Sequence, residues 1–313
     1  MSRKVAFITG ASRGIGKACA VELAEAGFDV AITARTVKEG EAREHSSTVK
    51  ASDTTPLPGS LDSTEELCRK VGVNVMSVFA DLLEPHTCGA AVTQVLERWG
   101  RIDVVVHNGR YIGPGHMDPF LDTPIDLLRK QIEANCIAPM AMNQLILPGM
   151  LARGEGTFIH ITSTSAYGSP LKGAGKGGWG MGYGVSKGAF QRVAGVMKAE
   201  FGDQGIRTYN VQPGFIATER MAQDMGKFGF FGGVTPFVPG RVIAWLATHP
   251  DEAAQYNGDT IEAQQFCWEN NLMPEWTDGP FQGKEETIKF DLAGLRRQEI
   301  GLGGKTHRPG IDD

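Results

Sequence analysis

Near its N-terminus the sequence reads Val5-Ala6-Phe7-Ile8-Thr9-Gly10-Ala11-Ser12-Arg13-Gly14-Ile15-Gly16, and this stretch decides the fold. Its first five residues form an apolar run of strand length, and residues 17–26 continue with a helical pattern. Glycines between a strand and a helix allow a tight turn and let the backbone approach a pyrophosphate closely. The helix N-terminus adds free N–H groups and the positive end of its dipole. The stretch therefore predicts a strand, a turn and a helix that bind a dinucleotide.

Short β-branched runs and helical patterns continue to alternate along the chain, which is typical of a parallel sheet covered on both faces. Strands are predicted at residues 5–9, 30–33, 75–79, 104–107, 157–161, 207–211 and 260–263. Helices are predicted near residues 15–26, 63–71, 87–99, 123–150, 182–201 and 239–248. We therefore expect an α/β fold with one doubly wound, seven-stranded parallel sheet and helices on both faces.

Three segments interrupt this alternation. Residues 37–61 form a long polar excursion after the second predicted strand, and residues 168–182 form a glycine-rich loop. Residues 275–313 carry glycines, prolines and charges. Composition leaves two alternatives for this tail, which are disorder and docking on a neighbouring subunit.

The composition argues against several classes of protein. Lys and Arg number 31 and Asp and Glu number 36, so the net charge is −5, and no segment is basic enough to attract nucleic acid. The five cysteines are scattered without a C-x-x-C pair, as in a reducing compartment, and the histidines lack the spacing of a metal site. The N-terminus does not resemble a signal peptide, and no apolar stretch could span a bilayer. We expect a cytoplasmic protein that binds neither metal nor nucleic acid.

The end of the second predicted strand indicates the cofactor. An acidic residue there would hold the ribose 2′-hydroxyl of NAD, but the sequence has Ala34-Arg35-Thr36. Arg35 can pair with a 2′-phosphate, and Arg13 of the glycine turn could lie on the same side. The alternative is that Arg35 is a solvated surface cation. The sequence favours NADP(H).

A second constellation carries the chemistry. Tyr183-Gly184-Val185-Ser186-Lys187 opens a predicted helix, and positions four apart share one helix face. Tyrosine ordinarily titrates near 10. A lysine ammonium one turn away stabilises the phenolate and lowers that pKa. Ser163, just past the fifth predicted strand, could donate a hydrogen bond to a substrate oxygen. These residues predict acid–base catalysis.

The chain resembles the classical short-chain dehydrogenase/reductase family, whose members have a Rossmann-type doubly wound sheet. The resemblance covers roughly residues 4–264. The motifs that carry it are Thr9-Gly10-x-x-x-Gly14-x-Gly16, Tyr183-x-x-x-Lys187, Ser163 at a strand end, Asp81 after the third strand, Asn135 in the fourth helix, and Pro213-Gly214 with Thr218 after the sixth strand.

The resemblance implies a role for each of these residues. Tyr183 would be the general acid/base, Lys187 would hold the nicotinamide ribose, and Ser163 would position the substrate oxygen. Asn135 would support a water-mediated proton relay to Lys187. The implied cofactor-binding residues are Gly10, Ser12, Arg13, Gly14, Ile15 and Gly16 in the turn, Arg35, Asp81, Leu82, Asn108 and Gly109 at strand ends, Tyr183 and Lys187 on the helix, and Pro213, Gly214, Ile216 and Thr218 at the nicotinamide end.

The sequence also departs from the family. The usual Asn-Asn-Ala-Gly after the fourth strand reads His107-Asn108-Gly109-Arg110, so Arg110 displaces a glycine that normally allows close approach of the cofactor. His107 is expected at the edge of the core. Ser163 stands among other hydroxyl residues, and Ser165 is the alternative to it. The glycine-rich loop lengthens the stretch between Ser163 and Tyr183, so we expect it to border the substrate.

The substrate lid of the family follows Thr218, here at about 219–240. The segment contains Met221, Met225, Phe228, Phe230, Phe231, Val234 and Phe237. Such side chains suit either a flexible apolar pocket or ordinary core packing. The first alternative predicts a steroid, terpenoid, aromatic or fatty substrate. We expect one domain over 1–270 that includes this lid, and a C-terminal extension over 271–313.

The expected function is that of an NADP(H)-dependent oxidoreductase, an alcohol dehydrogenase or ketoreductase that moves a hydride between nicotinamide and a secondary alcohol or ketone. One alternative is a reductase of 3-oxoacyl thioesters, which would need a basic surface that the sequence does not clearly show. The other is a non-catalytic NADP(H) sensor, which would not need the tyrosine and lysine. The family also implies a homodimer or homotetramer, formed through the helices near 123–150 and 182–201.

Overall fold

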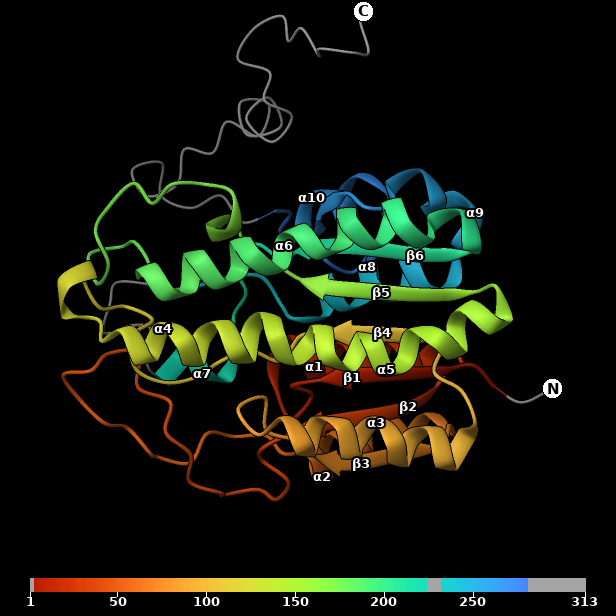
Figure 1. Ribbon diagram of the computed structural model, residues 1–313, viewed down its shortest axis with the longest axis horizontal. Coiled ribbons are helices and arrows are strands. Elements are labelled where there is room, and N and C mark those ends of the chain that lie inside the picture. The colour runs from red at the N-terminus through yellow and green to blue at the C-terminus, as the bar shows by residue number, and fades with distance from the viewer. Residues whose placement is uncertain (1–2, 224–231, 281–313) are drawn as a thin grey trace, which may run out of the picture.

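A seven-stranded sheet forms the centre of the computed structural model, which describes residues 3–223 and 232–280 (Figure 1). The strands run in the order β3-β2-β1-β4-β5-β6-β7, and every neighbouring pair is parallel. The chain builds one half outward from β1 and then crosses back to build the other half from β4. The predicted doubly wound sheet is confirmed. Its strands are β1 (Val5–Thr9), β2 (Asp29–Ala34), β3 (Val75–Phe79), β4 (Val104–His107), β5 (Gly156–Ile161), β6 (Ile206–Gln212) and β7 (Thr260–Glu262).

Helices cover both faces of this sheet. They are α1 (Gly14–Glu25), α2 (Leu61–Val71), α3 (Pro85–Trp99), α4 (Ile125–Ile132), α5 (Ala138–Arg153), α6 (Met181–Phe201), α7 (Glu219–Gln223), α8 (Phe237–Thr248), α9 (Pro250–Ala253) and α10 (Ala263–Glu269). Short 3-10 turns lie at 120–122, 164–166, 202–204 and 254–256. The long predicted helices correspond to α1, α2, α3, α4 with α5, α6 and α8, whereas α7, α9 and α10 were not expected.

Side chains of β1 show how the core divides into two layers. Ala6 and Ile8 belong to the cluster that contains residues of α1, α2, α8 and α10. Val5 and Phe7 point to the opposite face, into the cluster with residues of α3, α5 and α6. Successive side chains of a strand point to opposite faces, and both faces here are apolar, as in a sheet covered on both sides. Burial of this apolar surface supplies the main stabilisation of the fold.

The predicted helix over 123–150 is divided into two α-helices. A π-helical turn, Glu133–Ile137, separates α4 from α5. Pro139 lies at the start of α5 and has no N–H, so it cannot donate to the carbonyl of Asn135 as an α-helix requires. Inserted turns of this kind accommodate such a break and often lie at functional sites. The turn buries Asn135, so the interruption positions a predicted site residue.

Three long loops lie together at the edge of the sheet formed by the carboxyl ends of the strands. The carboxyl ends of parallel strands meet at one edge, and ligands bind there in doubly wound folds. The excursion at 37–60, the segment 108–124 and the glycine-rich loop at 168–180 all gather at that edge (Figure 1). The long connections therefore lie where a bound ligand would meet them.

The first part of the C-terminal extension packs on the domain itself. Trp276 is buried in the cluster around α1 and α8, and its ring meets that of Trp268 edge-on with centroids 5.6 Å apart. Arg241 of α8 also donates to the carbonyl of Leu272. Trp276 thus packs on the domain of its own chain, whereas residues 281–313 lie outside the described part of the chain, and the two alternatives for them stay predictions.

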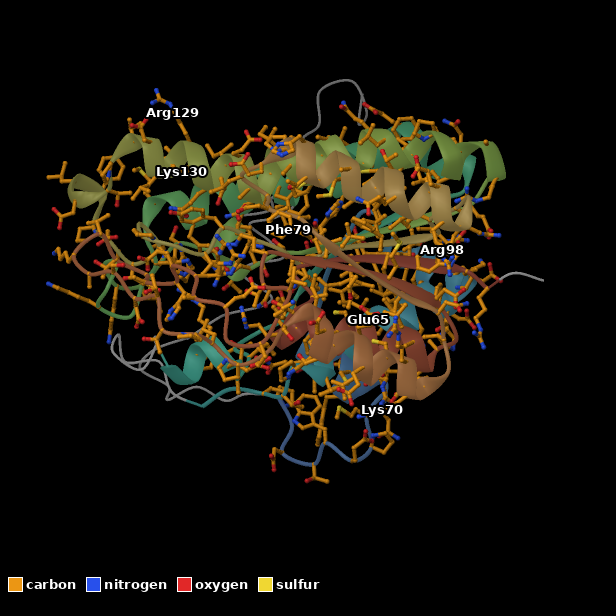
Figure 2. The ribbon with its side chains drawn as sticks, turned by 90° about the horizontal axis from the view of Figure 1, so that it is seen from below. Glu65, Lys70, Phe79, Arg98, Arg129 and Lys130 are labelled. Atoms are coloured by element: carbon orange, nitrogen blue, oxygen red, sulfur yellow. The ribbon has the colours of Figure 1, made fainter. Side chains whose placement is uncertain are left out.

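The outer faces of the helices carry charged side chains, with exposed apolar ones among them. Exposed charged side chains there include Lys70 on α2, Arg98 on α3 and Arg129 on α4 (Figure 2). No helix in the described residues is long and apolar enough to cross a membrane. The same residues contain no cluster of metal-ligating side chains. The five cysteines are all buried and unpaired.

Candidate functional site

The glycine turn has no space for side chains. Gly10 and Gly14 have φ values of +67° and +56°, a conformation that residues with a Cβ rarely adopt. A Cβ at Gly10 would lie 2.7 Å from the Cα of Gly109, and a Cβ at Gly16 would overlap the carbonyl oxygen of Gly10. These glycines bring the turn against the end of β4. They also leave the N-terminus of α1, which begins at Gly14, open toward the loops.

Asn108 fixes this turn to the next strand. Its side-chain amide donates to the carbonyl oxygens of Thr9 and Gly10, at 3.1 and 2.9 Å. The N–H of Gly109 donates to the hydroxyl of Thr9 at 2.9 Å. Asn108 and Gly109 were predicted to line the cofactor. They line the cavity described below and also hold the glycine turn in place.

A carboxylate stands at the N-terminus of α1. Oε2 of Glu219 accepts from the N–H of Gly14 at 2.9 Å, and its Oε1 lies 2.6 Å from Nζ of Lys17. Burial raises the pKa of Glu219, but the hydrogen bonds from Lys17 and from backbone N–H groups outweigh it and hold the pKa below its usual value. The helix terminus therefore attracts an anion in this structure, as expected for a phosphate-binding turn.

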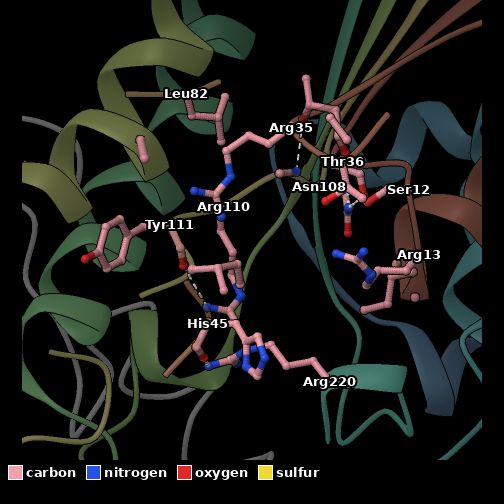
Figure 3. A pocket seen from close by; sticks show the side chains of 18 of the residues that line it. Ser12, Arg13, Arg35, Thr36, His45, Leu82, Asn108, Arg110, Tyr111 and Arg220 are labelled. Atoms are coloured by element: carbon pink, nitrogen blue, oxygen red, sulfur yellow. Dashed lines mark hydrogen bonds between the residues drawn. The ribbon is translucent and has the colours of Figure 1, made fainter. Parts of the chain in front are cut away.

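One cavity of about 340 Å³ runs along the sheet edge (Figure 3). It unites the glycine turn, the ends of the first strands and the start of α6. The predicted cofactor-binding residues that line it are Gly10, Ser12, Arg13, Gly14, Ile15, Arg35, Asp81, Leu82, Asn108, Gly109, Tyr183, Pro213, Gly214, Ile216 and Thr218. Gly16 and Lys187 lie behind this lining, where Gly16 packs on the turn and Lys187 is buried.

The polar excursion forms one wall of the cavity. Arg13 donates to the carbonyl oxygens of Leu57, Pro58 and Gly59, at 3.2, 2.9 and 2.7 Å. Its guanidinium is thus engaged by the excursion. A 2′-phosphate would have to compete with these three carbonyl oxygens for it. Sequence analysis missed these contacts because the carbonyls lie more than 40 residues along the chain.

Arg35 also faces the cavity, but unlike Arg13 its guanidinium is not engaged by the excursion. It is half-buried, and its side chain has no hydrogen-bond or ion-pair partner among residues 3–223 and 232–280. Its charge acts on neighbouring Tyr111, where burial raises the pKa of the phenol and Arg35 opposes that rise. A cation that faces a cavity and is not held in an ion pair suits an anionic group of a ligand.

Tyr183 and Lys187 lie one turn apart on α6, as predicted. Tyr183 lines the cavity. Lys187 is buried, and its Nζ donates to the carbonyl oxygen of Ile161 at 2.6 Å. Burial, and then the charge of Arg110, lower the pKa of Lys187 to about 7. With this pKa, the protonated and neutral forms of Lys187 are both populated near neutral pH.

Asn135 connects the π-helical turn to α6. Its Oδ1 accepts from the N–H of Tyr111 at 2.5 Å, and its Nδ2 donates to Oγ of Ser186 at 2.9 Å. Ser186 directly precedes Lys187 on α6. The amide thus reaches the helix that carries the predicted catalytic pair, through the serine rather than through the lysine.

Ser163 caps the short helical turn Thr164–Ala166. Its Oγ accepts from the N–H of Ser165 at 3.3 Å, so both serine candidates lie at the carboxyl end of β5. Ser163 is half-buried, whereas Ser165 is buried. Neither serine lines the cavity, so the choice of Ser163 over Ser165 stays a prediction.

The departure at Arg110 places a guanidinium beside the tyrosine. Its Cζ lies 5.6 Å from the ring centroid of Tyr183. The ring of His116 packs on the same tyrosine, with centroids 4.2 Å apart. His107, in contrast, is buried in the core and bonds to Asn143 at 2.6 Å, as its predicted place at the core edge implies. Sequence analysis noted Arg110 as a departure but missed His116 and Glu219.

Loops far apart in the sequence meet around this end of the cavity. Asp118 accepts from the hydroxyl of Thr48 at 2.5 Å and from the N–H of Val49 at 2.8 Å. Gly180, at the end of the glycine-rich loop, donates its N–H to the carbonyl of His116 at 2.8 Å. The excursion and the glycine-rich loop therefore both pack on the segment that follows β4.

Two hydrogen bonds join the segment just before the predicted lid to Val234 within it. The N–H of Ala217 donates to the carbonyl of Val234, whose own N–H donates to the carbonyl of Phe215, both at 2.9 Å. Val234 is buried in the core cluster, and Met221 lines the cavity. Of the other candidates, Phe237 is half-buried at the start of α8, whereas Met225, Phe228, Phe230 and Phe231 lie outside the described residues.

Comparisons with known proteins agree with this fold. The family model described as short chain dehydrogenase matches residues 4–67, and the one described as Enoyl-(Acyl carrier protein) reductase matches residues 56–233. Together they span more than half of the sequence. The chain belongs to the short-chain dehydrogenase/reductase family, and its fold is of the Rossmann type.

Individual relatives share about a quarter of their aligned residues with this chain. Dehydrogenase/reductase SDR family member 7B of Mus musculus is 28% identical over 215 residues, which are 68% of this chain and 58% of the mouse protein. Cyclohexanol dehydrogenase of Rhodococcus sp. (strain TK6) is 26% identical, over 72% of this chain and 79% of that enzyme. The crystal structure of a putative short-chain alcohol dehydrogenase from Sinorhizobium meliloti has a TM-score of 0.67 and 25% identity, and the match covers 84% of this chain and 95% of that one.

The carboxylate at α1 leads to a first prediction. Glu219→Gln removes a negative charge from the N–H groups that a cofactor phosphate would use, and it frees Lys17. An anion at a helix N-terminus contributes about 1 kcal/mol, so NADPH should bind roughly fivefold more tightly. The measurement is a fluorescence titration with NADPH, and Glu97→Gln on the exposed face of α3 is the control. Weaker or unchanged binding by Glu219→Gln would contradict this interpretation.

Proposed function

We propose that this protein is an NADP(H)-dependent alcohol dehydrogenase or ketoreductase that acts on a secondary alcohol or ketone. The observation that carries the proposal is the position of Tyr183. It lines the same cavity as the glycine turn and lies one helical turn from buried Lys187. A site with a dinucleotide turn and an acid–base pair in one cavity suits hydride transfer coupled to proton transfer.

The residues present fit a nicotinamide dinucleotide. The α1 terminus already holds a carboxylate where a phosphate is expected, and the Cβ-free turn lets a ligand approach the backbone. The bound cofactor would supply or accept the hydride. Asp81 and Leu82 would contact its adenine, and the segment from Pro213 to Thr218 would hold its nicotinamide end.

Tyr183 would hold the proton in this reaction. During reduction its hydroxyl would donate its proton to the carbonyl oxygen of the substrate, while the hydroxyl of Ser163 would donate a hydrogen bond to the same oxygen. Lys187, one helical turn along α6 from Tyr183, would in its protonated form stabilise the phenolate that remains. Asn135, linked to α6 through Ser186, would support the return of a proton to Lys187.

Tyr183→Phe tests this role. The substitution keeps the ring that packs on His116 but removes the proton donor, so turnover should fall by about 10² to 10⁴-fold. Activity is followed at 340 nm with NADPH and a panel of ketones that includes cyclohexanone, and NADPH binding is measured separately. Tyr256→Phe, which changes a tyrosine packed on Phe266 away from the cavity, is the matched control. Full activity in Tyr183→Phe would refute the mechanism.

The preference for NADP(H) rests on Arg35. No partner among the described residues engages its guanidinium, which faces the cavity beside Tyr111. Arg13, whose donors serve the excursion, would add only long-range attraction. Arg35 is thus the residue that we assign to the 2′-phosphate.

Arg35→Gln should weaken NADPH binding roughly 10- to 100-fold, because a hydrogen bond to a charged group contributes about 1.5–3 kcal/mol. NADH binding should hardly change, since NADH lacks the 2′-phosphate. Both dissociation constants are measured by fluorescence, with Arg98→Gln on the outer face of α3 as the control. A native preference for NADH, or an equal loss for both cofactors, would overturn the assignment.

The substrate class that we propose has an apolar body, of the steroid, terpenoid, aromatic or fatty type. Met221 in the cavity lining supports it, whereas Val234 belongs to the core instead. The sequence similarity to a cyclohexanol dehydrogenase favours an alcohol or ketone over a thioester. Tyr183 and Lys187 favour an enzyme over a sensor. A cytoplasmic location stays a prediction from the sequence.

We also propose self-association into a homodimer or homotetramer. Ile137 and Leu145 on the path of α5, and Val185 and Val196 on α6, are apolar side chains that are 42–54% exposed. Such a face suits contact with a second copy. Leu145→Asp should shift the mass found by light scattering toward the monomer, whereas Lys198→Asp, at an exposed charged position of α6, should not. A monomeric native protein would contradict the proposal.

A further inference from the structure

Arg110 brings a positive charge to the reacting end of the cavity. It lines the cavity (Figure 3). Its Cζ lies 5.6 Å from the ring centroid of Tyr183. The sequence departs from its family at this position, where a glycine is usual. The proposed reaction gives the guanidinium no necessary role, because Lys187 already stands behind the tyrosine.

Two acceptors hold Arg110 in one orientation. Its Nη1 donates to the carbonyl oxygen of Tyr111 at 3.0 Å and lies 3.4 Å from Nδ1 of His116. Burial, and then the charge of Arg110, keep the pKa of His116 well below its usual value, so this imidazole is neutral and can accept. Both contacts use Nη1. The opposite edge of the guanidinium, formed by Nε and Nη2, has no hydrogen-bond partner within residues 3–223 and 232–280.

No carboxylate of the described chain compensates this charge. The acidic side chains that line the cavity are engaged elsewhere: Glu41 pairs with Arg43 at 2.7 Å, Glu44 accepts from the N–H groups of Ser46 and Asp53, and Asp81 accepts from the N–H of Leu83. The charges that do act on this end of the cavity are those of Arg220 and Lys187. Arg110 is half-buried, and this burial lowers the pKa of its guanidinium. Such a cation is costly unless an anion joins it.

We propose that Arg110 binds a carboxylate of the substrate, so that this enzyme acts on an oxo acid or the corresponding hydroxy acid. The Nε–Nη2 edge is a planar fork that matches the two oxygens of a carboxylate. Its place beside the ring of Tyr183 puts that carboxylate within a few bonds of the carbonyl group. The remainder of the substrate can still be apolar.

The carboxylate takes no part in the bond changes. The bound cofactor would supply the hydride to the carbonyl carbon, Tyr183 would donate a proton to its oxygen, and the products would be the hydroxy acid and the oxidised cofactor. The carboxylate fixes which end of the molecule faces the tyrosine. This inference rests on the proposed function, because it names the substrate of the same site.

The cofactor is a less suitable source of the anion. Its phosphates find donors at the α1 terminus, where Gly14 and Lys17 already hold a carboxylate, and at Arg35. Arg110 instead accompanies Tyr183 and His116. Binding of NADPH to an Arg110 variant separates the two sources, since a phosphate-binding arginine would change that affinity.

The experiment compares paired compounds that differ only in charge. The pairs are 4-oxopentanoate and 2-oxo-4-phenylbutanoate, each with its methyl ester, and kcat/KM with NADPH is measured for each compound. The native enzyme should prefer at least one acid over its ester by tenfold or more. Arg110→Met should lower kcat/KM for that acid on the order of 100-fold and for its ester only slightly, since truncation of one partner of a buried charged pair is costly.

Further variants distinguish recognition from a structural role. Arg110→Lys keeps the charge but loses the fork, so it should recover part of the lost activity on the acid. Arg98→Met, on the exposed face of α3, should behave like the native enzyme. NADPH binding should be the same in all three variants. An equal loss on acid and ester, or weaker NADPH binding by Arg110→Met, would overturn the inference.

The inference and the proposed function can fail separately. Turnover of the esters without any preference for the acids would overturn the inference and leave the dehydrogenase in place. If the enzyme turns over none of these compounds, calorimetric titration of the NADPH complex with both acids still tests whether the Nε–Nη2 edge of Arg110 binds a carboxylate. Binding that Arg110→Met abolishes would support the carboxylate site, and absence of binding to the native complex would overturn it.

Discussion

Asn108 donates two hydrogen bonds from its side-chain amide to the carbonyl oxygens of Thr9 and Gly10. These bonds join β1 to β4, the two strands between which the strand order of the sheet reverses. At this point β1 is followed on one side by β2 and on the other by β4. The contact leaves no volume for a side chain at Gly10 or Gly16. Cavity, turn and helix terminus all depend on this close approach, because any displacement of β4 from the turn would open the end of the sheet.

The same constraint explains which features could be predicted from the sequence. The strands, and the turn with its glycines, follow from local periodicity and from spacing over a few residues. Tyr183 and Lys187 could be paired because they are four apart on one helix. Residues that depend only on their near neighbours are therefore found at the sheet edge where they were expected.

Other features depend on partners far along the chain. Glu219 reaches Gly14 over a separation of 205 residues, and Arg13 reaches carbonyls of the excursion. A sequence pattern carries no information on such pairs without the fold. The π-helical turn at Asn135 is also invisible to periodicity, because a single inserted turn leaves the apolar pattern on either side intact. Arg110 was visible as a departure, but its unpartnered edge depends on the positions of Tyr111 and His116.

The wall of the cavity also has a consequence for how the protein folds. Residues 37–60 contain no helix or strand, and part of their order comes from Asp118, about 70 residues later, and from Arg220, which donates to the hydroxyl of Ser47 across 173 residues. Contacts at such separations form late, because the chain must first close very long loops. During synthesis this wall cannot take its final form until residue 220 has emerged, by which time six of the seven strands have been made. The cavity is therefore complete only when nearly the whole domain has folded.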